Sequence, residues 1–282
     1  MKRALILCVI VCCVALSVVA QQITPTSNAR LLVTVTGNLE ACSPDKISAQ
    51  VDGTTAQITQ LTFAGSTPVD FVLLIDMSNS NRYKSTFEID TGLELYKQLL
   101  TGGHSGYFGD FDDRAYLDPK NSTLEAAAKG FKQMKVGGRT AIYDSVLQAA
   151  KFLVQQTRQS KRPRLIFVIT DGEDGVSKST PENAVQQLQT MGIAVHAITL
   201  FGDNSDKKRI SQFLRLSAET GGTSTVLAQP QKVVPLLLQA IHQQYWITID
   251  SPISPDNKLH SIQFSTTEST FKIHGPSRIT LQ

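Results

Sequence analysis

The alternation of apolar and polar residues divides this chain into three regions. Between residues 29 and 60, three short stretches alternate residue by residue and are separated by Gly, Pro and Asp: LLVTVTG, ISAQVDG and TAQITQL. From residue 243 the same pattern returns in YWITID, HSIQFST, TFKIH and SRITL. Period-two alternation between turn residues predicts short antiparallel strands. Because chain ends commonly lie close together, we expect the two flanks to pair into a small β-sandwich-like module.

The region from Val69 has a different pattern, in which apolar runs of four to eight residues alternate with helical segments. Buried parallel strands covered by helices give this pattern. We expect strands over residues 71–75, 165–169, 193–201 and 223–227, and a hairpin through Asp112 and Asp113. We expect helices after Asp76, over residues 121–134, from Thr140, and over residues 180–192, 207–220 and 231–242. The pattern therefore predicts an α/β fold, a doubly wound and mostly parallel sheet with helices on both faces.

Two of these helices carry strong local signals. Thr180 followed by Pro181 is an N-cap with proline at the first helical position. From Thr140, apolar residues recur at the i, i+4, i+7, i+8 and i+11 spacing of a helix that packs on one face. The residues of this stripe are Ile142, Val146, Ala149, Ala150 and Leu153.

The first 20 residues have the three-part layout of a secretory signal. Lys2 and Arg3 precede an apolar stretch, and the small residues Val18 and Ala20 precede a polar Gln pair. We expect cleavage after Ala20, a secreted or periplasmic and cell-envelope location, and no integral membrane span after cleavage. The alternative is an uncleaved anchor, since the apolar stretch approaches the ~20 residues that span a bilayer.

We accordingly divide the chain into a signal (1–20), an N-terminal β flank (21–68), an α/β domain (69–242) and a C-terminal β flank (243–282). The chain has 282 residues with 41% hydrophobic and 18% charged content, which excludes a disordered protein.

Charge and cysteine content narrow the classes of partner and chemistry. Loss of Lys2 and Arg3 with the signal lowers the formal charge from +3 to +1, and no basic arm or patch indicates nucleic acid. Three of the four cysteines lie in the signal, so only Cys42 remains. The fold is therefore not expected to depend on internal disulfides, and Cys42 is interpreted as an inert or exposed thiol.

Candidate chemistry concentrates in three polar loops. FVLLIDMSNS contains Asp76, Ser78 and Ser80, GGRT contains Thr140, and RLIFVITDGED contains Asp171. If the two apolar runs are neighbouring parallel strands, these side chains meet at their carboxyl ends, where open α/β sheets bind ligands. Oxygen-only ligands suit Mg²⁺, with Mn²⁺ or Ca²⁺ as alternatives. We expect the hydroxyls to bind directly and the carboxylates through water. The ion would then keep much of its charge and take an Asp or Glu side chain from a partner protein.

These motifs resemble those of a known family. DMSNS, GGRTAIYDSVLQAA and LIFVITDGED resemble the three motifs that form the metal-ion-dependent adhesion site of von Willebrand factor type A domains. The resemblance covers about residues 69–242, implies a Rossmann-like fold, and provides all five metal positions. The flanks are similar to an exported bacterial VWFA-related family first noticed in acidobacteria.

The chain departs from that family pattern in its first loop. Relatives often have D-x-S-G-S-M, whereas this chain has Asn79 for the glycine and Asn81 for the methionine. Because Asn tolerates left-handed backbone angles, we expect the turn to survive and the ligand preference to change. With Gly138 and Glu173, these two asparagines form the expected ligand-binding rim.

Other polar residues are interpreted as structural. Asp144 is expected on a helix surface, and Glu173 and Asp174 on a solvated rim. Asp110, Asp112 and Asp113 lack the Gly and Glu of an EF-hand and are expected to be turn residues. His196, which alternates within an apolar strand, is expected to be a satisfied core imidazole.

The sequence favours a metal-dependent protein-binding module and no enzymatic activity. The first alternative is a metal-assisted hydrolase that uses the ion as a Lewis acid. Catalysis needs a nucleophile or base beside the metal, but Ser78 occupies the second Asp position of a D-x-D pair and no G-x-S-x-G elbow is present. The second alternative is a structural domain with an unused site.

Overall fold

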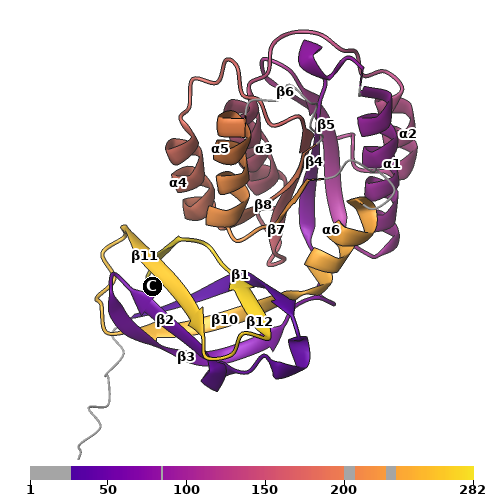
Figure 1. Ribbon diagram of the computed structural model, residues 1–282. Helices are drawn as coiled ribbons and strands as arrows, with labels where there is room; N and C mark the ends of the chain where they lie inside the picture. Colours follow the sequence, from indigo (N-terminus) through magenta and orange to yellow (C-terminus); the bar gives the residue numbers. More distant parts are fainter. Residues whose placement is uncertain (1–26, 84, 200–206, 227–232) are drawn as a thin grey trace, which may run out of the picture.

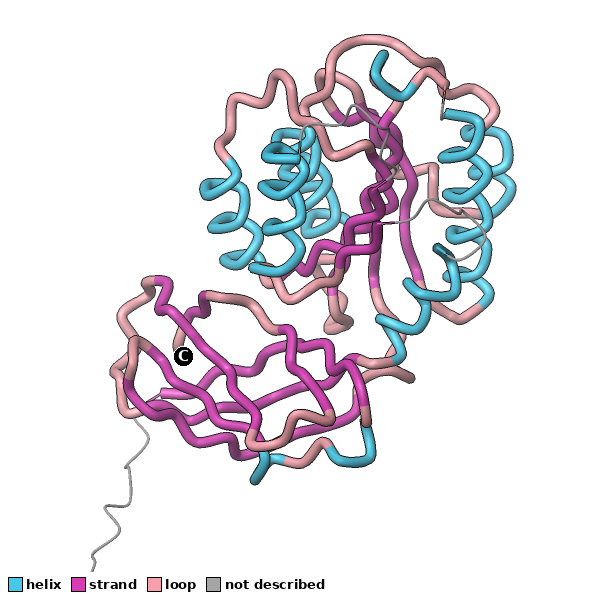
Figure 2. Tube along the Cα trace, in the orientation of Figure 1, coloured by secondary structure: helices cyan, strands magenta, loops and turns pink. Residues whose placement is uncertain are grey.

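The computed structural model describes residues 27–83, 85–199, 207–226 and 233–282. It contains an α/β unit with helices on both sides of a central sheet, and a second unit made of a curled antiparallel sheet (Figures 1 and 2). The predicted signal, with Cys8, Cys12 and Cys13, lies outside the described residues. Among the helices that the structure describes, none is long and apolar enough to cross a bilayer.

The α/β unit is a six-stranded sheet with the strand order β6-β5-β4-β7-β8-β9. All neighbours are parallel except β6, which forms an antiparallel hairpin with β5. The predicted doubly wound sheet is thus confirmed. In chain order the elements are β4 (Asp70–Asp76), α1 (Ser85–Thr101), β5 (Ser105–Phe111), β6 (Ala115–Leu117), α2 (Leu124–Phe131), α3 (Ile142–Gln156), β7 (Arg164–Thr170), α4 (Pro181–Met191), β8 (Ile193–Thr199), α5 (Lys207–Glu219), β9 (Ser224–Val226) and α6 (Val233–His242).

The two faces of this sheet bury two hydrophobic cores. Every residue of β4 is buried, and alternate side chains point to opposite faces. Phe71, Leu73 and Ile75 pack in the core under α1, α2 and α6. Val72 and Leu74 pack in the core under α3, α4 and α5. Burial on both faces explains why β4 is continuously apolar up to Asp76.

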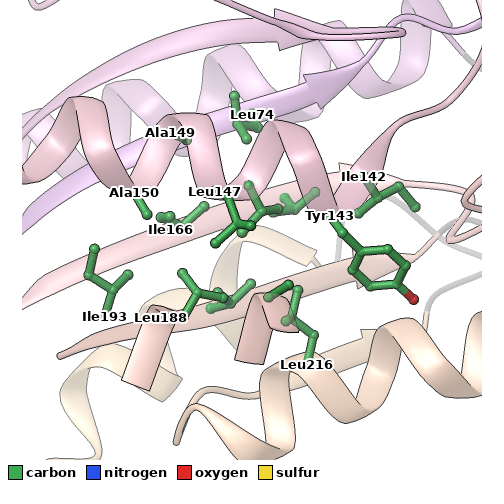
Figure 3. Close-up of a cluster of buried hydrophobic side chains, with 14 of the residues drawn as sticks. Leu74, Ile142, Tyr143, Leu147, Ala149, Ala150, Ile166, Leu188, Ile193 and Leu216 are labelled. Carbon is green, nitrogen blue, oxygen red and sulfur yellow. The ribbon is translucent and has the colours of Figure 1, made fainter. Parts of the chain in front are cut away.

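Helix α3 is the main cover of the second face. Figure 3 shows Leu147, Ala149 and Ala150 of α3 among the buried side chains of this core, together with Ile166 of β7 and Leu188 of α4. The small residues of the predicted stripe let α3 approach the sheet closely. This packing fixes the N-terminal end of α3 against the loops that follow β4 and β7.

Some helix boundaries differ from those expected. The helix expected over residues 121–134 is limited to α2, which begins where the hydroxyl of Thr123 accepts a hydrogen bond from the Ala126 amide. Helix α4 begins as predicted, with the Thr180 hydroxyl accepting from the Asn183 amide, and Gly192 ends it at a φ of 64°.

The two chain flanks form one seven-stranded antiparallel sheet, in the order β12-β1-β10-β3-β2-β11-β13. The C-terminal strand β10 lies between β1 and β3, so the flanks pair with each other as predicted. The sheet curls around its own core, in which Val33, Val51, Ile247 and Ile249 are fully buried. The elements are β1 (Ser27–Gly37), η1 (Leu39–Ala41), η2 (Pro44–Lys46), β2 (Ile47–Val51), β3 (Thr54–Phe63), β10 (Gln244–Ser251), β11 (Leu259–Thr266), β12 (Phe271–His274) and β13 (Arg278–Thr280).

Cys42 lies in this flank sheet unit, directly after η1. It is half-buried and forms no disulfide among the described residues. Partial burial raises the pKa of its thiol, which lowers the thiolate fraction and with it the reactivity of the sulfur.

Candidate metal centre

The predicted site lies at the point of the sheet where the order in which the chain adds strands reverses. After β4 the chain adds β5 and β6 on one side of it, and then β7, β8 and β9 on the other side. β4 and β7 are therefore parallel neighbours, and their following connections run to opposite sides. Loops diverge at such a switch point and leave a crevice at the carboxyl ends of the strands. The pairing of Ile75 with Ile169 places Asp76 beside Thr170 and close to Asp171.

Three hydroxyls from two of the loops form a compact triangle. The Thr140 hydroxyl lies 2.8 Å from the Ser78 oxygen, which lies 3.0 Å from the Ser80 oxygen. The third side, between Ser80 and Thr140, measures 3.5 Å. Ser78 and Thr140 are buried, whereas Ser80 is exposed. The triangle therefore has a buried base and one solvent-facing corner.

The two carboxylates are buried beside this triangle. Asp76 is fully buried, its Oδ1 accepts a hydrogen bond from the Ser78 amide at 2.9 Å, and its Oδ2 accepts from the Thr170 hydroxyl at 2.6 Å. Burial, with a smaller effect of the Asp171 charge, raises the pKa of Asp76 to about 6. Asp171 is 5% exposed, and its Oδ1 accepts from the Glu173 amide at 3.1 Å. Two negative groups are thus held close together and away from water.

The second loop is fixed to the first by the rim residues. The backbone amide and the side-chain amide of Asn79 both donate to the Gly138 carbonyl, at 3.3 and 2.9 Å. Gly138 has a φ of +62°, and a Cβ added there would lie 2.6 Å from Oδ2 of Asp112. Only glycine fits this position without strain. Asn79 and Gly138, expected as ligand contacts, thus also hold the loop that carries Thr140.

The turn of the first loop survives as expected, but the left-handed backbone angles offered as the reason are not used. Residues Asn79–Asn81 form a short 3-10 helix, η3, and neither asparagine is among the described non-glycine residues with a positive φ. The turn therefore survives the loss of glycine because it needs no left-handed residue. The asparagine amide instead provides the cross-loop hydrogen bond to Gly138.

Two aspartates have larger structural roles than the sequence suggested. Asp174, expected on a solvated rim, accepts hydrogen bonds from the Ile142 amide at 2.7 Å and the Ser177 amide at 3.3 Å. It thereby caps α3 from another loop, and α3 begins at Ile142 rather than Thr140. Asp144, expected on a helix surface, is half-buried and accepts from the amides of Lys178 and Ser179. The two carboxylates join the third loop to the start of α3.

The aspartates of the β5–β6 hairpin lie next to the second loop. Asp112 and Asp113 occupy the turn as predicted, and the Asp112 carbonyl accepts from the Ala141 amide at 2.8 Å. Asp110, which was also expected to be a turn residue, lies within β5 instead. It is partly buried, and burial raises its pKa to about 6. Through the hydrogen bond between Asp112 and Ala141, the hairpin thus holds the loop that carries Thr140.

The arrangement of oxygens fits a small hard cation. At Mg²⁺–oxygen distances of 2.0–2.1 Å, neighbouring vertices of an octahedron lie about 2.9 Å apart. Two sides of the hydroxyl triangle, 2.8 and 3.0 Å, match this spacing. Within the described residues no group of three or more His, Cys, Asp or Glu could hold a metal. A site here would therefore depend on the hydroxyls, with the two aspartates providing the charge.

Comparison with known proteins gives the following matches. The family model for the von Willebrand factor type A domain matches residues 109–239, which include Thr140 and Asp171. No curated protein matches. A von Willebrand factor type A structure from Catenulispora acidiphila is 12% identical, with a TM-score of 0.49 over 90% of this chain and 73% of that chain.

Two further solved structures share the fold of the α/β unit. An aerotolerance-related membrane protein from Bacteroides fragilis is 18% identical, with a TM-score of 0.50 over 61% of this chain and 98% of that chain. Proximal thread matrix protein 1 from the mussel byssus is 20% identical, with a TM-score of 0.50 over 62% of this chain and 47% of that chain. The two solved structures, both under 25% identical, show the fold alone, and the family match with the sheet order makes residues 109–239 similar to a von Willebrand factor type A domain.

Proposed function

We propose that this protein is an exported, metal-dependent protein-binding module that captures an acidic side chain of a partner. In this proposal the hydroxyls of Ser78, Ser80 and Thr140 would hold a divalent ion directly, and Asp76 and Asp171 would bind it through water, so that the ion keeps much of its charge. The ion, Mg²⁺ in the first instance and Mn²⁺ or Ca²⁺ as alternatives, would supply a positive centre to which a carboxylate binds. The single observation that carries the proposal is the hydroxyl triangle, with sides of 2.8, 3.0 and 3.5 Å.

The electrostatics of the site support a cation. The carboxylates of Asp76 and Asp171 are both buried, and the charge of Asp171 disfavours ionisation of Asp76. A bound cation would relieve this repulsion, because an opposite charge nearby favours the ionised form. The exposure of Ser80 leaves one side of the site open to solvent and hence to a partner.

The surface around the site supports an acidic partner. Arg82 and Arg139 are both exposed and come from the loops that carry Ser80 and Thr140. Arg139 donates to the Gly175 carbonyl at 3.3 Å, which places its guanidinium over the third loop. Tyr83 is 98% exposed beside the first loop. Positive rim charges accelerate association with an acidic surface, and an exposed aromatic is a common anchor at interfaces.

These three rim residues were not singled out from the sequence. Their sequence positions could have indicated a role at the rim. Arg82 and Tyr83 follow Ser80 by two and three residues, and Arg139 directly precedes Thr140. An exposed Tyr or Arg next to a predicted ligand loop is a candidate partner contact.

The first test is whether the folded protein binds the ion. We expect MgCl₂ or MnCl₂ to raise the midpoint of thermal unfolding and EDTA to reverse the increase, because a ligand that binds only the folded form stabilises it. Thr140→Ala should abolish the increase. Thr123→Ala is the matched control, since it removes the cap of α2 at the end of the sheet where β4 and β5 begin, and it should lower the midpoint while preserving the increase with Mg²⁺. An equal response of wild type and Thr140→Ala would contradict the proposed ligand set.

The second test concerns the partner. The protein is immobilised and incubated with extracellular and envelope proteins of the source organism, once with Mg²⁺ and once with EDTA. We expect specific partners in the Mg²⁺ sample only, and their loss with Asp171→Ala. Partners retained equally with EDTA would show that binding does not use the ion.

We also propose that the domain is not an enzyme. This is supported by the histidines of the described residues, which hydrogen-bond outside the hydroxyl triangle and so do not serve as a base beside it. The partners are Val69 for His104, Thr223 for His196, Gly65 for His242, Asp52 and Asp256 for His260, and Thr36 for His274. Metal-dependent turnover of any phosphate or carboxylate ester in a substrate panel would revive the hydrolase alternative.

A further inference from the structure

A second concave site lies between the two units, at the end of the α/β sheet opposite the candidate metal centre. Its volume is about 380 Å³, which suits a small molecule. One wall comes from residues 160–164 and 189–194 of the α/β unit, where β7 and β8 begin. The other wall comes from residues 29–32, 276–282 and Trp246 of the flank sheet. The cleft thus exists only because both units contribute to it.

The charged side chains that line the cleft are all basic. No Asp or Glu side chain is among the described residues that line it. The positive charge of Arg162 is partly compensated by Asp70, which lies 3.9 Å away and does not line the cleft. Arg162 also donates a hydrogen bond to the Ser105 hydroxyl. The basic residues that line the cleft are Arg30, Lys161, Arg162, Arg164 and Arg278.

Two of these arginines are held in fixed orientations. The guanidinium of Arg164 donates from Nε and Nη2 to the hydroxyl and carbonyl of Thr157, at 2.8 and 2.9 Å. The guanidinium of Arg30 lies over the ring of Trp246, 4.4 Å from its centroid. Orienting a guanidinium in advance reduces the entropy lost when its remaining N–H groups bind the oxygens of an anion.

We propose that this cleft binds a small ligand carrying a phosphate or sulfate group on a sugar-sized body. The arginines would hold the oxyanion, and the volume beside Trp246 would hold the sugar. Positive side chains that line one cleft with no acidic side chain in its lining repel one another, so an anion that bridges them is favoured. The site is independent of the metal centre, because none of the five predicted metal ligands lines it.

The protein carries its own reporter for this test, because Trp246 is the only tryptophan in the chain. The full chain is titrated with glucose 6-phosphate in metal-free Tris chloride buffer at constant ionic strength, and Trp fluorescence is recorded. Parallel titrations use glucose 6-sulfate, inorganic phosphate and neutral glucose. We expect a saturable change with glucose 6-phosphate or glucose 6-sulfate, a weaker one with inorganic phosphate and none with glucose. The comparison of the first two identifies the oxyanion.

Substitutions separate a built site from general charge. Arg278→Gln should weaken binding at least about tenfold, because it removes a charged hydrogen-bond donor while leaving the surroundings of Trp246 intact. Arg30→Gln should do the same, measured by calorimetry since it changes the fluorescence directly. Lys129→Gln removes one positive charge from the exposed end of α2 and should bind like wild type.

The folding of each variant is checked by circular dichroism, and Arg30→Lys, which keeps the charge but not the planar stack, provides a second variant if Arg30→Gln does not fold. The proposal is overturned if sodium chloride alone reproduces the fluorescence change. It is equally overturned if the cleft variants bind as tightly as Lys129→Gln, or if no anion of the panel gives a saturable response.

Discussion

Asp174 joins the third loop to the start of α3. Its carboxylate accepts hydrogen bonds from the Ile142 amide at the start of α3 and from the Ser177 amide of its own loop. An aspartate near a helix N-terminus also interacts favourably with the helix dipole. The loop that carries Asp171 is therefore held in place by the helix that follows Thr140.

We expect Asp174→Ala to lower the free energy of unfolding by about 1 kcal/mol, the usual cost of losing a helix cap. Urea denaturation measures the change. Asp174→Asn, which keeps an acceptor oxygen, should lose less. If the alanine variant is as stable as wild type, the cap observed here contributes nothing.

Single residues were predictable from the sequence where their role is local. Ser78 and Ser80 lie two residues apart in one motif, so their proximity follows from a tight turn. The roles of Asp144 and Asp174 depend on a loop that folds back over a helix, and no local spacing reveals that contact. His196 was interpreted as a satisfied core imidazole, but only Nδ1 bonds to Thr223, and Nε2 is buried with no partner in the described part of the chain. Burial lowers the pKa of His196 to about 4, so the ring stays neutral.

At the scale of elements, the contact between α1 and β4 is limited by Gly92. This glycine is buried within α1, and a Cβ added there would overlap the Cδ1 methyl of Ile75 and lie 3.0 Å from the Phe131 ring. Gly92→Ala gains about 1 kcal/mol of helix propensity, but overpacking a core costs about 1–3 kcal/mol.

We therefore expect Gly92→Ala to destabilise the protein by up to about 2 kcal/mol, measured by urea denaturation. Ile75→Val removes the overlapping methyl, so the double variant should be more stable than the sum of the single effects predicts. Strict additivity would show that the overlap with Ile75 is not the cause.

A histidine in the flank sheet links two turns to β11. His260 is 8% exposed at its side chain and lies between Asp52, at 2.7 Å, and Asp256, at 3.0 Å. The Asp52 hydrogen bond is the main reason that the pKa of His260 is raised above its usual 6.5. Lys258, which pairs with Asp256 at 3.3 Å, is the other charged group there. Because the folded-state pKa is raised, the stabilisation is fully present below pH 6.5 and is lost as the pH rises through the folded-state value.

We expect the stability of wild type to fall as the pH increases from 6.5, and His260→Gln to weaken this dependence. Stability is measured by urea denaturation at several pH values. His274→Gln is the control, because burial lowers the pKa of His274 and its imidazole is neutral throughout this range. An unchanged pH dependence in His260→Gln would assign the effect to other groups.

Element types were predictable because their hydrophobic periodicity is strong, but some ends were not. The stripe of α3 follows from the sequence, whereas its start at Ile142 depends on the Thr140 carbonyl, which accepts the amides of Gly175 and Val176 instead of serving the helix. For α2, the Asn121 carbonyl accepts hydrogen bonds from the Phe108 amide and the Tyr96 hydroxyl instead of serving a helix, and these long-range contacts leave no signal in the local sequence.

At the scale of the whole molecule, the two units have separate hydrophobic cores. They meet where the Gln189 side chain donates to Ser277 at 3.0 Å and the Ser277 amide donates to the Glu219 carbonyl at 3.0 Å, and through the bridge between Thr220 and Pro276. Leu32 of β1 also packs against the α/β core, but each unit buries a hydrophobic core of its own, as domains that can fold independently do.

We therefore expect two transitions in calorimetry. Ile249→Ala, in the flank core, should destabilise by about 2–5 kcal/mol and lower only the transition that does not respond to Mg²⁺. A single transition that shifts as a whole would show that the interface couples the two units.

The pairing of the flanks was predictable because both show period-two alternation, and the sheet satisfies the backbone groups of both. The register and the curl were not, since β10 inserts between β1 and β3 rather than at an edge. The basic cleft was also beyond prediction. Its arginines come from sequence positions as distant as Arg30 and Arg278, and only the docking of the two units brings them together.

The α/β unit is an insertion between two hydrogen-bonded neighbours, because it begins after β3 and returns to the sheet through β10. Phe63 at the end of β3 pairs with Tyr245 near the start of β10, so both connections leave the sheet at the same end. A tensile force on a partner held at the far end of the α/β unit would pull these two strands in the same direction. The resistance then falls on the ladder of β10 with β1, which runs from Ser27 with Ser251 to Thr34 with Gln244. When the opposing force acts on β1 at Ser27, those hydrogen bonds are perpendicular to the pull, so they are sheared together rather than opened one at a time.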